Sequence, residues 1–269
     1  MRRSVPIWMY HHVSPDREIT PEGFERQLRH LLDQGYTSLS MSELLQGVRG
    51  ERSLDRPAFV VTFDDGYLDN WLYAFPILKK LSVKAVMYLV TEKVERESNL
   101  RHPFPVVDTR SNERGPGGFF SWAEARAMRE SGLVEFGSHT HTHRHWVRKT
   151  PFETIEQELS QSKRMIEEEL SQRCVHLAWP WGEYEISWWP LLQRLGYETA
   201  VTTRSGPNTV GTNPLALRRI NVSRENLGWF DQKLAWSTRV WPARLIGPWI
   251  GLDRRLKTWL HRETPYAHG

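Results

Sequence analysis

Residues 58–66 read AFVVTFDDG, an apolar run that ends abruptly in two adjacent carboxylates and a glycine. The run is short and rich in β-branched and aromatic residues, which predicts a buried β-strand over residues 58–63. Asp64 and Asp65 repel each other, and neither is easily buried without a partner. The pair therefore predicts a bound cation, a catalytic role, or both.

Short apolar runs alternate with helical patterns along the first 220 or so residues. The apolar runs predict strands over residues 6–10, 58–63, 84–90, 133–137, 175–179, 198–202 and 215–222. Helices are predicted between the strands. Three have start signals, at Thr20-Pro21, Ser40-x-x-Glu43 and Ser121-x-x-Glu124, and the others are predicted over 68–81, over 151–171 and in a segment that ends at 195. This alternation predicts an α/β fold with a parallel sheet, either closed as a barrel or open and doubly wound.

Composition limits the class of protein. The 269 residues are 39% hydrophobic and 25% charged, which is typical of a globular chain with a substantial core. The single cysteine, Cys174, excludes an intramolecular disulfide and fits a reducing compartment. No secretory signal pattern and no run of about 20 apolar residues is present, so we expect a cytoplasmic protein. Because no long Lys/Arg block accompanies the net charge of +4, we expect no nucleic-acid partner.

Three polar motifs directly follow predicted strands: TFDDG at 62–66, GSHTHTH at 137–143 and WPWGEY at 179–184. In both candidate architectures the carboxyl ends of parallel strands meet at one rim, where ligands bind. We therefore expect the three motifs to share that rim. Residues 96–118, rich in Pro, Gly and Arg, predict a long loop on the same side.

The histidine motif indicates a metal site. His139 and His143 are four residues apart, a spacing that on a helical turn brings two imidazoles to one face. The alternative is a polar loop whose other histidines face solvent. Two histidines and one carboxylate would leave coordination positions open, as in catalytic metal sites. The second acid could then take a proton from a water that the metal activates.

The motifs TFDDG, H-T-x-T-H and P-W-G-x-Y, in this order, resemble the polysaccharide deacetylases, the NodB-homology group of carbohydrate esterases. The segments WMYHHVSP, FERQLRHLLDQGY and LRRINV are similar to the branch typified by poly-N-acetylglucosamine deacetylases. The resemblance covers roughly residues 5–225. It implies a distorted or incomplete (β/α) barrel and hydrolysis of an N-acetyl group from an amino sugar with a divalent metal, often zinc.

The resemblance also implies roles for individual residues. Asp64 would be the general base, and Asp65, His139 and His143 would hold the metal. The substrate-binding residues implied on the third motif are Pro180, Trp181, Gly182 and Tyr184. The Pro-Trp-Gly turn would line the acetyl pocket, with the Trp181 N–H helping to hold the oxyanion and both aromatic rings available to stack on a sugar. The alternative for this motif is a tight turn whose aromatic side chains serve only as packing.

The chain departs from the family pattern at two points. Ala178 stands where many members have an arginine that pairs with the base, and no late Leu-x-x-His supplies a general acid. Arg219 is a candidate replacement beside Asp64, and His11 is preferred over His12 as a residue that contacts substrate. An ordinary ion pair for Arg219 and a structural role for His11 are the alternatives.

The C-terminal residues differ in composition from the rest. We divide the chain into a catalytic domain, 1–225, and a helical tail, 226–269. Residues 229–262 carry five tryptophans and seven Lys or Arg residues, and from 249 onward tryptophan and basic side chains fall on opposite helical faces. This pattern predicts a helix lying in a membrane interface. The alternatives are a helix that covers the barrel or a dimer contact.

The leading hypothesis is a metal-dependent N-deacetylase acting on an amino sugar of a glycan, a lipopolysaccharide or a lipid-linked saccharide. The protein would then be cytoplasmic and peripheral on the inner membrane face. A deformylase or other amide hydrolase acting on a lipid-carried sugar is the first alternative. The second is a degenerate barrel that binds glycan or membrane without turnover, although a binding module has no need for both acids.

Overall fold

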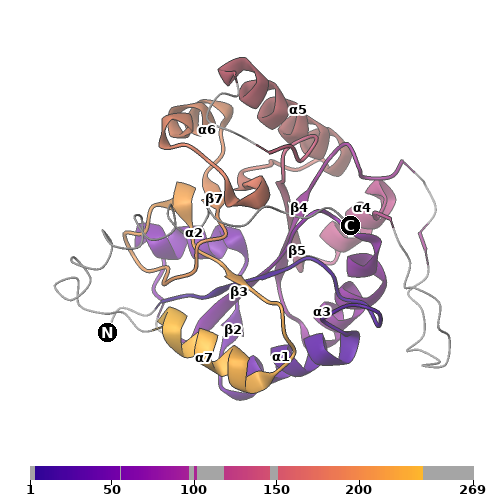
Figure 1. Cartoon of the computed structure of the whole chain (residues 1–269), viewed down its shortest axis with the longest axis vertical. Helices are drawn as coiled ribbons and strands as arrows, with labels where there is room; N and C mark the ends of the chain where they lie inside the picture. Colours follow the sequence, from indigo (N-terminus) through magenta and orange to yellow (C-terminus); the bar gives the residue numbers. More distant parts are fainter. Residues whose placement is uncertain (1–3, 55, 97–99, 102–117, 146–150, 239–269) are drawn as a thin grey trace, which may run out of the picture.

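Parallel β-strands form the centre of the protein (Figure 1). The computed structural model describes residues 4–54, 56–96, 100–101, 118–145 and 151–238. The strands are β1 (Ile7–Tyr10), β2 (Thr37–Ser38), β3 (Ala58–Phe63), β4 (Ala85–Leu89), β5 (Val134–Ser138), β6 (His176–Ala178), β7 (Thr199–Val201) and β8 (Ile220–Asn221). They are ordered β7-β6-β5-β4-β3-β1-β8, with β2 paired to β3 beside this path, and every pair is parallel.

The sheet curls until its two ends approach each other. Val201 at the end of β7 bridges to Leu217, three residues before β8, and β8 in turn pairs with β1 through Trp8 and Ile220. The result is the distorted, incomplete (β/α) barrel that the sequence predicts. Segments from the two ends of the sheet are therefore neighbours, which matters for the site described below.

Seven α-helices surround the sheet in the described part of the chain (Figure 1). They are α1 (Pro21–Asp33), α2 (Met41–Arg49), α3 (Phe75–Leu81), α4 (Trp122–Glu130), α5 (Phe152–Leu170), α6 (Trp189–Leu195) and α7 (Leu227–Thr238). The predicted starts are confirmed: the Thr20 side chain accepts from Gly23 N–H, and capping boxes begin α2 at Ser40 and α4 at Ser121.

The side chains of β3 alternate between two apolar clusters. Ala58 and Val60 belong to a cluster that joins one face of the sheet to α2, whereas Phe59, Val61 and Phe63 join the other face to the remaining helices. Strand side chains alternate with a period of two, so Asp64, the residue after β3, lies on the same face of the sheet as Ala58 and Val60. This face is the inner face of the curled sheet. The strand thus aims its first carboxylate into the barrel.

Two predicted elements differ in the structure. The helix predicted over residues 68–81 begins with a π-helical turn, Asn70–Ala74, before α3. The strand predicted over 215–222 is wrong at its first two residues, which belong to a 3₁₀ turn, Pro214–Ala216; Leu217 then bridges to Val201, and the regular strand β8 has two residues. The Asn213 side chain accepts from the Leu215 N–H, so a local side-chain contact replaces a ladder hydrogen bond there.

The first part of the predicted tail packs on the barrel. In α7, Phe230 is fully buried and stacks on Trp8 with ring centroids 3.8 Å apart, and Asp231 lies 2.7 Å from His30 of α1. Residues 239–269, which carry most of the predicted membrane-binding pattern, lie outside the described residues, as does most of the 96–118 loop. Across the described ranges, the helices are too short or too polar to cross a membrane.

Candidate active site

The two acids after β3 are separated by a sharp turn of the chain. The Asp64 N–H still donates to the Tyr10 carbonyl at 3.0 Å, which continues the strand ladder. Asp65 and Gly66 then adopt left-handed φ angles of 73° and 85°. A left-handed conformation strains Asp65, whereas glycine adopts it freely. The turn lets the adjacent carboxylates face different partners, which answers the repulsion expected for them.

The histidine motif follows β5 as an irregular loop. The prediction that His139 and His143 share a helical turn is wrong, because Thr140 and His143 have left-handed φ angles of 65° and 58°. The His143 N–H donates to the Thr140 hydroxyl at 3.2 Å. Two left-handed residues reverse the chain within five positions, and this brings the imidazoles together by a different route.

Asp65, His139 and His143 converge on one point. The Asp65 Oδ1 atom lies 3.3 Å from His143 Nε2 and 3.7 Å from His139 Nε2, and all three ligand atoms lie within 4.8 Å of one another. Ligand atoms bound about 2.1 Å from a tetrahedral metal lie roughly 3.4 Å apart. Asp65 Oδ1 is buried and makes no hydrogen bond within the described structure. These residues therefore fit a divalent cation.

The surroundings of the two histidines favour neutral imidazoles. His139 Nδ1 lies 2.8 Å from the Ala178 carbonyl oxygen, which can only accept, so Nδ1 carries the proton and Nε2 is free. Burial lowers the pKa of His143 to about 4. His143 is therefore neutral near pH 7, as a metal-binding imidazole must be.

Asp64 has a different partner. Arg219 Nη1 and Nη2 donate to its two oxygens at 2.6 and 2.7 Å, and both side chains are buried. Burial alone would raise the pKa of Asp64, but the Arg219 charge and its hydrogen bonds to the carboxylate lower the pKa well below its ordinary value. Asp64 is thus held ionised beside the candidate metal ligands, with its Oδ2 atom 3.8 Å from His139 Nε2.

Arg219 reaches Asp64 because the curled sheet brings the segment before β8 next to the end of β3. Two further donors go to the Thr202 carbonyl and the Thr62 hydroxyl, at 3.0 and 3.3 Å, so that four of its five N–H groups have partners. The expected pairing with Asp64 is therefore present, and the small Ala178 leaves the usual arginine position without a cation. A guanidinium so fully occupied favours holding Asp64 over touching substrate.

The WPWGEY motif forms a tight turn after β6. Pro180 is buried, whereas the Trp181 side chain is 57% exposed at a φ of 59° and stacks on His145 at 4.5 Å. Gly182 has a φ of 72°, and a Cβ there would collide with the Thr203 side chain. Tyr184 packs partly buried against the core. Trp181 is thus available at the rim, and for Tyr184 the packing alternative describes its position better.

The two histidines after β1 lie in different surroundings. His11 follows the inward-facing side of β1, and its charge contributes to the lowered pKa of Asp64. His12 Nδ1 instead lies 2.6 Å from Asp69 Oδ2, and its ring stacks on Tyr67 at 3.8 Å. This agrees with the preference for His11 as the residue nearer to substrate, a role that stays a prediction.

Sequence reasoning missed the surroundings of His12. Asp69 is buried, and burial raises its pKa against the opposing effect of His12. Burial, followed by the Asp65 charge, raises the pKa of Tyr67 to about 12. No pattern links residues 57 positions apart, so the sequence carries no signal for the His12–Asp69 contact.

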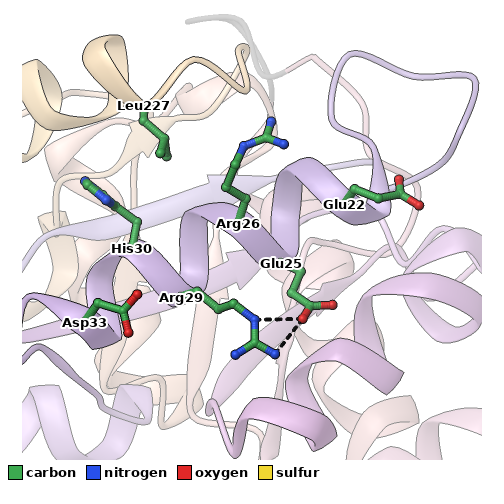
Figure 2. A pocket seen from close by; sticks show the side chains of 7 residues that line it. All are labelled: Glu22, Glu25, Arg26, Arg29, His30, Asp33 and Leu227. Carbon is green, nitrogen blue, oxygen red and sulfur yellow. Dashed lines mark hydrogen bonds and ion pairs between the residues drawn. The ribbon is translucent and has the colours of Figure 1, made fainter.

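An open groove elsewhere on the surface contains none of the predicted site residues. It runs along α1 to the start of α7 (Figure 2) and is lined by Glu22, Glu25, Arg26, Arg29, His30, Asp33 and Leu227. Its charges are largely paired, as the Arg29–Glu25 ion pair at 2.7 Å illustrates. The groove therefore offers no chemistry comparable to that of the rim.

Comparison with known proteins identifies related sequences and structures. Residues 51–200 match the family model for polysaccharide deacetylase. YxkH of Bacillus subtilis is 25% identical over 221 residues, covering 81% of this chain and 71% of that protein. The poly-β-1,6-N-acetyl-D-glucosamine N-deacetylase of Staphylococcus aureus (strain MSSA476) is 23% identical over 214 residues, covering 76% of this chain and 68% of that enzyme.

The fold is also found among solved structures. The structure of IcaB from Ammonifex degensii superimposes with a TM-score of 0.73 at 22% identity, covering 88% of this chain and 98% of that one. At this identity the likeness concerns the fold. It supports the curled parallel sheet with outer helices as the architecture of this chain.

Proposed function

Because this chain belongs to the polysaccharide deacetylase family, we propose that it removes the N-acetyl group from an amino sugar in a glycan. Membership makes it a carbohydrate deacetylase, a hydrolase of carbon–nitrogen amide bonds. The observation that carries the proposal is the division of labour between two adjacent acids. Asp65 lies with His139 and His143, whereas Asp64 is held ionised by Arg219.

Asp65, His139 and His143 would hold the divalent cation, for which we propose zinc. When bound, the cation would supply Lewis acidity, which polarises an acyl oxygen and lowers the pKa of a nearby water. Nitrogen ligands with one carboxylate suit zinc. The hydrogen bond from His139 to the Ala178 carbonyl fixes the ring in the orientation that points Nε2 toward Asp65.

Asp64 is the proposed general base. Its pKa lies below the ordinary range, so it is ionised and ready to accept a proton from the attacking water at neutral pH. The arginine occupies one lone pair on each oxygen, and each oxygen keeps a second acceptor site. Arg219 therefore orients Asp64 without preventing proton transfer.

Trp181 and His11 are the proposed contacts to substrate. The Trp181 ring is exposed beside the metal-binding residues, 5.4 Å from the His143 ring, where it can stack on a sugar. Its backbone N–H is the proposed donor to the oxyanion, in the turn shaped by Pro180 and Gly182. A polymer of N-acetylglucosamine is the first substrate to test, because the Staphylococcus aureus relative is named for that polymer.

The test is an acetate-release screen over polymer-, lipid- and nucleotide-linked N-acetyl sugars, with Asp64→Asn as the control. We expect acetate from at least one class with the wild-type protein and none with the variant. Release of formate from an N-formyl sugar would favour the deformylase alternative. Zinc binding with no acyl product from any sugar would favour a barrel that binds glycan without turnover.

We also propose that the protein works at the inner membrane face on lipid-linked saccharides, on the basis of the tryptophan and arginine pattern in residues 239–262. Vesicles containing anionic lipid should retain the full chain more strongly than a chain ending at Thr238, which keeps α7 and its contact with Trp8. Equal retention of the two proteins would contradict this proposal.

A further inference from the structure

The loop that carries the two histidine ligands, residues 139–143, needs support from outside itself. Thr140 and His143 are non-glycine residues in the left-handed region, at φ angles of 65° and 58°. Such a residue is strained and persists only where the surrounding structure holds it. Something must therefore fix this loop, called the histidine loop below.

Glu158 of α5 provides that support. One carboxylate oxygen accepts the backbone N–H groups of His141 and Thr142, both at 2.9 Å. The other oxygen accepts the Thr142 hydroxyl at 2.7 Å. Glu158 is only 8% exposed, and no Lys or Arg in the described ranges pairs with it. Among the residues that the structure describes, the partners of its buried charge belong to the histidine loop and bind it through charge-assisted hydrogen bonds.

Neighbouring residues of α5 extend the same contact. Gln161 Nε2 lies 3.0 Å from His141 Nε2, and the Ser162 hydroxyl lies 2.8 Å from that of Ser138. These contacts flank His139 on both sides in sequence. One face of α5 thus contacts Ser138 before the first histidine ligand, and His141 and Thr142 between the two ligands.

We propose that Glu158 is a positioning residue that holds the histidine loop in its metal-binding conformation. The proposal rests on the proposed metal site, since it concerns the residues that form it. Without the Glu158 acceptors, the strained loop relaxes, and the two imidazole Nε2 atoms no longer lie close to Asp65 Oδ1. The cation is then bound more weakly, although Glu158 itself lies outside the ligand set.

The test compares Glu158→Gln with Glu156→Gln. Glu158→Gln keeps the shape of the side chain but replaces one acceptor oxygen with an NH₂ group, which cannot accept a hydrogen bond. The control changes an acid on the same helix that pairs with Arg194 at 2.8 Å, away from the loop. Zinc affinity is measured against a chromophoric chelator, the visible spectrum of the cobalt-loaded protein reports ligand geometry, and melting of the metal-free protein reports the fold.

For Glu158→Gln we expect zinc to bind roughly 10- to 100-fold more weakly, as for other residues that support ligands, with an altered cobalt spectrum. Glu156→Gln should bind zinc within about twofold of the wild type, since it touches no part of the loop. If Glu158→Gln does not fold, Thr142→Val replaces it. That change removes a single hydroxyl hydrogen bond and should weaken zinc binding about fivefold.

Unchanged zinc affinity in the folded variant would overturn the proposal. If the wild-type protein binds no zinc or cobalt, the metal site and this proposal fail together. If the wild type binds zinc and releases no acetate, the deacetylase proposal fails while the role of Glu158 is still decided by the affinities. The two proposals can therefore fail separately.

Discussion

Arg219 and Asp64 form a two-point ion pair inside the barrel although they lie 155 residues apart in the sequence. The pair exists because the sheet curls until Leu217 bridges to β7 and β8 pairs with β1. It joins the last strand to the strand that carries the acids. Fold and site are thus coupled through one buried contact, which generates the first two predictions.

Asp64→Asn should abolish most acetate release while leaving the metal bound. The amide cannot accept the proton, and loss of a general base costs about 10²- to 10⁴-fold in rate. Metal content by mass spectrometry and acetate release are measured on the same preparation. Loss of metal together with activity would show that Asp64 is a ligand and contradict its assignment as base.

Arg219→Gln should destabilise the protein by roughly 3–5 kcal/mol, because it leaves a buried carboxylate without its partner. Combining it with Asp64→Asn removes both charges, so the double variant should lose less stability than the two single variants added together. Urea unfolding of the four proteins measures this coupling. Additive losses would mean that the two side chains do not stabilise each other.

Asp65→Asn and His139→Ala should each lose bound zinc, since each removes one of three converging ligands. A matched control is His30→Ala, a histidine on α1 that pairs with Asp231 far from the cluster. The control should retain zinc in stoichiometric amount after gel filtration. Zinc retained by both ligand variants would rule out this cluster as the metal site.

Trp181→Ala should raise KM for a polymeric substrate roughly three- to tenfold with kcat little changed, because stacking on a remote sugar ring binds ground state and transition state alike. Trp236→Ala is the control, since that side chain is 50% exposed on α7, away from the rim. Steady-state kinetics on both variants distinguish them. A fall in kcat alone would move Trp181 from substrate binding to the chemical step.

The sequence predicted the parts of this structure that depend on local signals. The capping boxes at Ser40 and Ser121 and the bounds of β3 follow from a few adjacent residues. The convergence of Asp65 with His139 was also predictable, because the carboxyl ends of parallel strands meet at one rim. These features required no knowledge of distant contacts.

Other parts depend on contacts that no local pattern encodes. The four-residue spacing of His139 and His143 suits a helix, and only the structure reveals the left-handed turn. Glu158 lies three positions after Ile155 and four before Ser162, both buried, so an acid on the buried side of a helix was a usable signal. The partner of that acid, 16 and 17 residues away, still required the tertiary structure.

Arg101→Ala should destabilise the protein at pH 7 by roughly 2–4 kcal/mol. Arg101 donates to the buried Glu124 from Nε and Nη2, at 2.9 and 2.7 Å. Burial raises the pKa of Glu124, but the hydrogen bonds from Arg101 and from the Ser121 N–H lower it by a larger amount. The pKa of Glu124 therefore lies below the ordinary value of 4.5.

A carboxyl group whose pKa is lower in the folded than in the unfolded state stabilises the folded state at pH values above its unfolded-state pKa. That stabilisation is lost as the pH falls through its folded-state pKa. The difference in Tm between wild type and Arg101→Ala should therefore be full at pH 7 and shrink below about pH 4.5. Melting curves over this range provide the measurement. A difference independent of pH would assign the loss to packing and backbone contacts of Arg101.

The central claim is that a metal held by Asp65, His139 and His143 works with Asp64 to release acetate from an N-acetylated amino sugar. One measurement tests it directly: acetate release from poly-N-acetylglucosamine by the wild-type protein before chelation, after chelation, and after zinc is restored. The account predicts activity, loss and recovery for the wild type, and activity at least about 100-fold lower in Asp64→Asn. Acetate release that survives complete removal of metal, or a zinc-loaded protein that releases none from any amino sugar, would contradict it.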